Sequence, residues 1–182
     1  MRKLYISAAL MLGVLAFSAC EEQDATPVFQ EPTTFVLNTP AYVNGTYDLE
    51  RSTSLELTCS QPDYGFTAAT SYAVEVSLSG VFDGTESTVL GTTYSTARMN
   101  VDAAEMAAAL TALATAADPT LTEEDFPMET EVHVRLIASL TASNKGQIVS
   151  NSIILPSVRL HFALPAVNLP EKLYLIGQCN GW

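Results

Sequence analysis

Between Thr33 and Leu164, apolar and polar side chains alternate in short runs that are separated by turn residues. An alternation with a period of two is typical of a strand that is buried on one face and exposed on the other. The clearest runs are Ser54–Ser60, residues 71–79 and residues 131–136, and we expect shorter or less regular strands at 35–37, 147–155 and 158–162. The pattern therefore predicts a protein built mainly from β-strands.

The alternation also predicts which side chains lie in the core. Those on the apolar faces of the clearest runs are Leu55, Leu57, Cys59, Tyr72, Val74, Val76, Leu78, Val132, Val134 and Leu136. Cys59 continues an apolar row and has no basic neighbour that would lower its pKa, so we interpret it as a small core residue rather than a reactive thiol. His133 falls on a polar face, which predicts a solvated histidine, and His161 lies in a strand-like run with no catalytic neighbourhood. Asn44-Gly45 and Asn144-Lys145-Gly146 predict turns.

One segment departs from the strand pattern and predicts a helix. Asp102 and Glu105 have the spacing of a capping box, in which the first side chain caps the helix and the second bonds back to the start. The apolar residues that then recur at helical spacing are Met106, Leu110, Leu113 and Ala117. Asp118-Pro119 ends the helix, since proline disfavours helical backbone in the residue before it. About seven strands with one inserted helix predict an all-β fold, a sandwich of immunoglobulin or fibronectin type III.

The N-terminus has the order of a secretory signal: a charged start at Arg2 and Lys3, an apolar run from Leu4 to Phe17, and small residues before Cys20. The apolar run has about 14 residues, fewer than the roughly 20 that span a bilayer as a helix. We therefore predict that residues 1–19 are a lipoprotein signal peptide and that Cys20 becomes the lipid-bearing first residue of the mature chain. The alternative is an ordinary signal peptide that is cleaved after Ala19, with an incidental cysteine.

An acidic cluster, Glu21, Glu22 and Asp24, follows the expected lipid anchor directly. It resembles the acidic export signal that sends Bacteroidetes lipoproteins across the outer membrane to the cell surface. A solvated acidic tether is the other interpretation, and the two are compatible. Residues 20–32 contain two prolines and few large apolar side chains, which is the composition of a tether rather than of a folded domain.

The charge and the residue counts exclude several kinds of function. The formal net charge is −12, and removal of residues 1–19 takes away two basic residues and no acidic one, which leaves the mature chain near −14. A nucleic-acid-binding surface needs a basic stripe, which this chain lacks. Two cysteines besides Cys20 and two histidines are too few for a zinc site of usual spacing, so we expect no metal or cofactor. No phosphate-binding glycine loop or nucleophile elbow is present, which makes an enzyme the weakest hypothesis.

The run LTCSQPDYG at Leu57–Gly65, followed by YAVEVS at Tyr72–Ser77, resembles the SusE family of outer-membrane lipoproteins from glycan-utilisation systems. In that family the first run has the form L-x-W-x-x-P-D-Y-G and the second Y-x-V-E-V-S. Cys59 stands where the family usually has tryptophan, and we expect this change to affect packing rather than binding. The resemblance implies a membrane-proximal sandwich over residues 33–163, followed by carbohydrate-binding modules.

The end of the sequence resembles the beginning of such a module. Residues 164–170 contain two prolines and predict a linker, and residues 171–182 are expected to be the first strand and turn of a truncated carbohydrate-binding module. Gln178–Trp182 resembles the turn that opens starch-binding modules, which makes Trp182 a candidate platform for a sugar ring. A structural role for Trp182 at the turn is the alternative. On this interpretation the sequence is a fragment or a shortened gene.

Together these features predict a surface lipoprotein that binds a starch-like polysaccharide, with this chain mainly its membrane anchor and spacer. The partners implied are the glycan, held by modules beyond this chain, the outer membrane and a SusC/SusD-type importer complex. The alternative is a structural or protein-interaction module that docks on the importer and binds no glycan. We also predict that the sandwich alone retains no polysaccharide, because its tyrosines are spread over different segments. These are Tyr42, Tyr47, Tyr64 and Tyr94.

Overall fold

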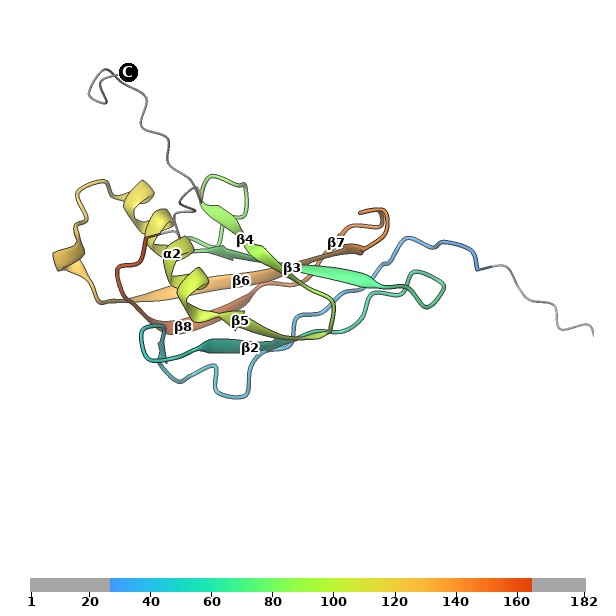
Figure 1. Cartoon of the computed structure of the whole chain (residues 1–182), viewed down its shortest axis with the longest axis horizontal. Helices are drawn as coiled ribbons and strands as arrows, with labels where there is room; N and C mark the ends of the chain where they lie inside the picture. Colours follow the sequence, from blue (N-terminus) through green and yellow to red (C-terminus); the bar gives the residue numbers. More distant parts are fainter. Residues whose placement is uncertain (1–26, 165–182) are drawn as a thin grey trace, which may run out of the picture.

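The computed structural model describes residues 27–164, which form two layers of strands and one long helix (Figure 1). The larger sheet has six strands in the order β1–β8–β6–β3–β4, with β7 also paired to β6, and the smaller sheet pairs β2 with β5. The strands are β1 (Tyr47–Asp48), β2 (Ser54–Thr58), β3 (Thr70–Ser77), β4 (Ser87–Tyr94), β5 (Arg98–Asp102), β6 (Met128–Leu140), β7 (Ile148–Val149) and β8 (Ile153–Leu160). Helix α2 (Ala103–Ala117) and a 3₁₀ turn, η1 (Glu123–Asp125), connect β5 to β6.

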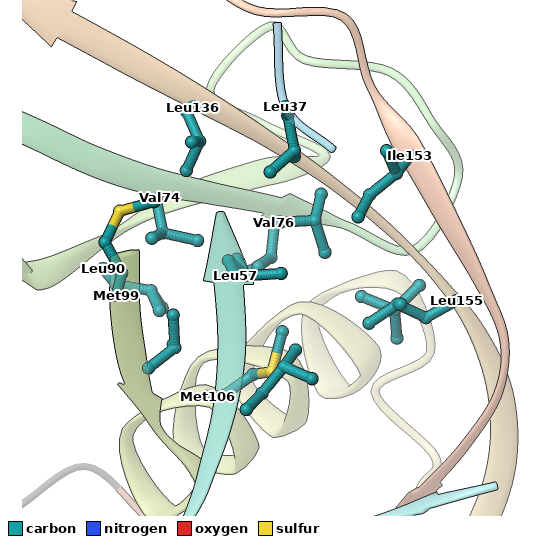
Figure 2. Packing of buried hydrophobic residues seen from close by; sticks show 14 of the residues in the cluster. Leu37, Leu57, Val74, Val76, Leu90, Met99, Met106, Leu136, Ile153 and Leu155 are labelled. Atoms are coloured by element: carbon teal, nitrogen blue, oxygen red, sulfur yellow. The ribbon is translucent and has the colours of Figure 1, made fainter. Parts of the chain in front are cut away.

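One hydrophobic core lies between the two sheets and α2. Leu57 from β2, Val74 and Val76 from β3 and Met106 from α2 are fully buried, and Figure 2 shows them converging from the different layers. The predicted alternation is confirmed in β2, β3 and β6, where the apolar faces point into this core. The prediction of a mainly β protein with one inserted helix is confirmed, and the arrangement is that of a β-sandwich.

Cys59 lies at the edge of the same core. Cys59 is 9% exposed, and burial raises the pKa of its thiol to about 11. The thiol is therefore neutral at physiological pH, which confirms the prediction of a core residue rather than a reactive group.

Helix α2 begins at the predicted cap but uses only half of the predicted capping box. The Asp102 carboxylate accepts the Glu105 N–H at 2.8 Å, whereas Glu105 Oε1 accepts the N–H of Thr92 on β4 at 2.9 Å. Met106, Leu110 and Leu113 are buried as expected. Ala117 is exposed, so the prediction for it was wrong; Ala114 is the last buried residue of the helix.

Residues 35–37 form no regular strand, contrary to the prediction. Leu37 makes only an isolated antiparallel bridge with Cys59. The Asn151 side chain takes the place of a second strand neighbour: its Oδ1 accepts the Leu37 N–H at 3.0 Å and its Nδ2 donates to the Leu37 carbonyl at 3.1 Å. A buried backbone needs such partners, and a side chain supplies them here.

The predicted break between strands 147–155 and 158–162 was misplaced. The chain leaves the sheet after Val149, where the Ser150 hydroxyl accepts the N–H of Leu136 at 2.9 Å. It then runs through Pro156 as the single strand β8. Pro156 lies at a register shift, since Val132 pairs with Leu155 and Thr130 with Val158. A proline is tolerated at such a bulge because no ladder hydrogen bond is lost there.

The outer face of β3 and β6 is polar, as predicted, but part of it is buried. Glu75 is 5% exposed, because the loop between β3 and β4 folds over it. Arg135 Nε donates to Glu75 Oε2 at 2.7 Å, and the Ser87 hydroxyl donates to Oε1 at 2.8 Å. The Arg135 guanidinium also lies over the ring of Phe82, 4.3 Å from its centroid.

His133 lies under the same loop, so the prediction of a solvated histidine was wrong. Its side chain is only 17% exposed, and its Nε2 lies 3.0 Å from a carboxylate oxygen of Glu131. Gly80 allows the loop to pass close to the His133 side chain, since a Cβ at position 80 would lie 3.0 Å from the imidazole ring.

Candidate functional site

The residues predicted to carry function, namely Cys20, Glu21, Glu22, Asp24 and Trp182, lie outside the described residues 27–164. The structure nevertheless describes the end of the expected tether, residues 27–32, and its contact with the sandwich. This contact decides where the chain leaves the folded domain on the side of the predicted lipid anchor.

The tether is held on the loop that follows β2. The Gln30 N–H donates to the Tyr64 carbonyl at 2.9 Å, and the ring of Phe29 stacks on that of Tyr64 with centroids 6.3 Å apart and an angle of 21° between the planes. We call this contact, made by residues 28–30 with Tyr64, Gly65 and Gly146, the tether clamp. A stacked aromatic pair and a backbone hydrogen bond each contribute about 1 kcal/mol.

Local sequence explains the shape of this loop. The Asp63 carboxylate accepts the Gly65 N–H at 2.8 Å, which closes a tight turn. Gly65 has a φ of +80°, and a Cβ there would lie 2.6 Å from the Val28 carbonyl oxygen. Gly146, with a φ of +63°, lies against both rings of the clamp: a Cβ there would lie 2.7 Å from the Tyr64 ring and 3.2 Å from the Phe29 ring. Both glycines are needed because the tether and the Tyr64 ring approach the backbone so closely.

Tyr64 is the central side chain of the clamp and is 1% exposed. Burial raises the pKa of its phenol, and the negative charge of Glu31 raises it further. The ring is therefore neutral at physiological pH and acts as a packing surface for Phe29. The Pro-Asp-Tyr-Gly run supports the family resemblance, but the sequence alone did not predict that Tyr64 contacts the tether.

Of the four tyrosines that the sequence spreads over different segments, Tyr42 and Tyr47 line the same groove. Tyr64 is buried in the clamp, whereas Tyr42 is 84% exposed and lines one open groove of about 450 Å³ together with Tyr47. The rest of that groove includes polar side chains of Asn38, Ser54 and Thr58. The sandwich thus has one surface where an aromatic ring and hydrogen-bonding groups lie together, which the spacing in the sequence did not indicate.

We predict that Gly65→Ala opens the tether clamp without unfolding the sandwich. The new Cβ would collide with the Val28 carbonyl, and the left-handed backbone would add strain of about 1–2 kcal/mol. We expect chymotrypsin to cleave after Phe29 about tenfold faster, since 1.4 kcal/mol shifts an opening equilibrium tenfold. Cleavage is followed by mass spectrometry on the Cys20→Ser form of the chain.

Gly84→Ala is the matched control for this variant. Gly84 has a φ of +82°, and nothing lies within 4 Å of a Cβ built on it. It therefore carries the same backbone strain without the contact to the tether. Equal cleavage rates after Phe29 in the two variants would contradict the tether clamp.

Within 27–164, no group of three or more His, Cys, Asp or Glu side chains is placed to hold a metal ion. The same part of the chain contains no helix with the length and apolar character of a membrane span.

Comparison with known proteins identifies one family. The model of the family described as SusE outer membrane protein matches residues 22–136, from the tether through most of β6. The match includes Phe29, Tyr64 and Gly65, so the main partners of the tether clamp lie within the shared region. No solved structure matches the chain. Since the matched region covers more than half of the sequence, the chain belongs to the SusE outer membrane protein family and is a protein of the outer membrane.

Proposed function

We propose that this chain is the membrane anchor and spacer domain of a cell-surface lipoprotein that binds a starch-like polysaccharide. The observation that supports this most directly is the position of the two ends of the described chain. The two ends of the coloured trace lie toward opposite ends of the long axis of the domain (Figure 1). A domain that receives the anchor at one end and passes the chain on at the other sets a distance between membrane and downstream modules.

The tether clamp limits how far the sandwich lies from the predicted anchor. Cys20 precedes Pro27 by seven residues, and an extended chain covers at most about 3.5 Å per residue, or roughly 25 Å. Lipid attached to Cys20 would hold the domain within that distance of the membrane, and multiple acyl chains make such attachment stable. In this proposal Glu21, Glu22 and Asp24 direct export to the cell surface.

The topology supports an immunoglobulin- or fibronectin-like type of sandwich. Successive strands change layer: β2 lies in the small sheet, β3 and β4 in the large one, β5 in the small one and β6 in the large one again. Such crossing between sheets is a feature of Greek-key sandwiches. In many of them the edges and loops, rather than the core, are used for binding.

The spacer assignment predicts that residues 27–164 retain no polysaccharide in affinity gels. A sugar platform needs aromatic faces that are exposed together, and Tyr42 is the only tyrosine of the described part with most of its surface in solvent. Migration through gels with and without starch should be equal. We propose that retention comes from modules beyond this chain, and that Trp182 contributes to one of them.

Retardation of the 27–164 fragment would contradict the spacer assignment. The Tyr42→Ala variant then tells where the glycan is bound. If Tyr42→Ala abolishes this retardation, the groove lined by Tyr42 and Tyr47 is the binding site, and the domain contacts glycan directly. The exposed position of Tyr42 makes the substitution safe for the fold.

A further inference from the structure

A second groove lies between α2 and β4, the edge strand of the large sheet. It has a volume of about 660 Å³, and its walls are mostly apolar. Its two walls include Val89 and Gly91 on β4 and Ala104, Ala108 and Ala112 on α2. Alanines at these helix positions leave the space unfilled, because a methyl group reaches only a short way toward the strand.

Strand β4 and helix α2 are joined at one end of this groove. The pairing of β4 with β3 shifts register around Gly91, since Ala73 pairs with Thr93 and Glu75 with Val89. At this irregularity Thr92 donates its N–H to Glu105 in the first turn of α2. The strand edge is therefore fastened to one end of the helix, and the groove extends from that contact along the helix.

The chain itself leads into this groove. The Thr111 hydroxyl of α2 donates to the His161 carbonyl and accepts the Ala163 N–H, each at 3.3 Å. These two bonds hold the segment after β8 against the helix. Leu164, the next residue, lines the groove and is 72% exposed. The last described residue is thus an apolar side chain at the entrance of an apolar groove.

We propose that residues 165–170, which continue the expected linker after Leu164, bind in the groove between β4 and α2. The part of α2 that lines the groove, from Ala104 to Ala112, is about 12 Å long at 1.5 Å per residue. An extended chain covers that distance in about four residues. The segment Pro-Ala-Val-Asn-Leu-Pro that follows Leu164 is therefore long enough to reach the far end.

The chemistry of this segment fits the groove. Val167 and Leu169 supply the apolar side chains that the alanine wall leaves room for. Pro165 and Pro170 have no N–H, so the segment brings fewer backbone donors into an apolar surface, where unpaired donors are unfavourable. Proline also favours extended backbone, which reduces the entropy lost on binding.

This proposal goes beyond the spacer function. A linker bound along α2 would fix the direction in which the chain continues after residue 170, so the downstream segment would be oriented rather than freely tethered. The proposal does not depend on glycan binding, and its test is separate from the affinity gels.

Hydrogen exchange of the Cys20→Ser chain, measured by mass spectrometry, tests the linker position. We expect the amides of residues 166–169 to exchange at least about tenfold more slowly than in a free chain. Ala112→Arg should remove this protection, since a long charged side chain would fill the entrance. Val167→Asp should do the same from the linker side. Ala116→Arg is the control, because Ala116 is exposed on the same helix but does not line the groove.

Three outcomes would overturn the proposal. The first is hydrogen exchange of the amides of residues 166–169 at the free-chain rate when the linker and the groove are unchanged. The second is protection that survives both Ala112→Arg and Val167→Asp, which would place the linker elsewhere. The third is protection that rises with protein concentration, which would assign the groove to a second copy of the chain. Protected amides of β6 in every variant show that the sandwich is folded.

Discussion

The Cys20→Ser variant is expected to carry no fatty acid and to leave the membrane fraction. The thiol of Cys20 is the proposed attachment point for lipid, and serine offers no sulfur for the thioether. Without acyl chains, the acidic mature chain has no other means of stable attachment in this proposal. Metabolic labelling with a fatty-acid probe, followed by membrane fractionation, measures both effects. Label that persists on Cys20→Ser would contradict the lipoprotein assignment.

Two control variants separate lipid attachment from other effects. Cys59→Ala removes a buried thiol in the core and should leave labelling unchanged. Replacement of Glu21, Glu22 and Asp24 together by Ala should also preserve the label, but should protect the protein from external protease on whole cells. If the acidic residues are only a solvated tether, surface accessibility in this triple variant will equal that of the unmodified protein.

Arg135→Met should lower the free energy of unfolding by about 3 kcal/mol, because it leaves the Glu75 carboxylate buried without its cation. The Glu75 side chain is 6% exposed, whereas that of Arg135 is 25% exposed. Glu75→Gln should therefore be milder: the remaining guanidinium can reach water, and the amide still accepts a hydrogen bond. Urea titration of the Cys20→Ser chain, followed by circular dichroism, measures the differences.

The exposed pair of Arg98 and Glu56 is the matched control for this prediction. Arg98 Nη2 and Glu56 Oε2 also lie 2.7 Å apart, but the side chains of Arg98 and Glu56 are 73% and 47% exposed. Arg98→Met should therefore change the free energy of unfolding by less than about 1 kcal/mol. The double variant Glu75→Gln/Arg135→Met should recover part of the loss, since no charge is then left buried. Equal effects of Arg135→Met and Arg98→Met would contradict the role of burial.

The parts of the fold that sequence predicted are those in which one face of an element meets the core. Leu57, Val74 and Val134 follow a simple alternation, and Met106 and Leu110 a helical one, because burial alone decides their positions. Strand β5 was not predicted, although its side chains alternate regularly between exposed and buried, and neither was strand β4. Its register shift near Gly91 and its place at the sheet edge remove the regular alternation that identifies a strand.

Features that depend on distant residues were not predictable in the same way. Glu75 alternates like a solvent-facing residue, and its burial depends on Arg135, 60 positions later, and on the loop that carries Phe82. The tether clamp is a similar case. The Asp63–Gly65 turn is visible in the sequence, but its partner Phe29 lies in a segment whose composition indicates a tether. No local pattern links the two.

The parallel pairing of β1 with β8 affects how the domain responds to tension. Tyr47 pairs with Val158 and Asp48 with Arg159, and the Leu49 N–H donates to the Arg159 carbonyl at 3.1 Å. β1 is the first strand after the tether, and β8 is the last before Leu164. When the two ends of the described chain are pulled apart and the contacts of Gln30 and Leu37 have opened, these parallel neighbours are drawn past each other along their length. Their hydrogen bonds are then loaded in shear and share the force, whereas an antiparallel terminal pair would peel open one bond at a time.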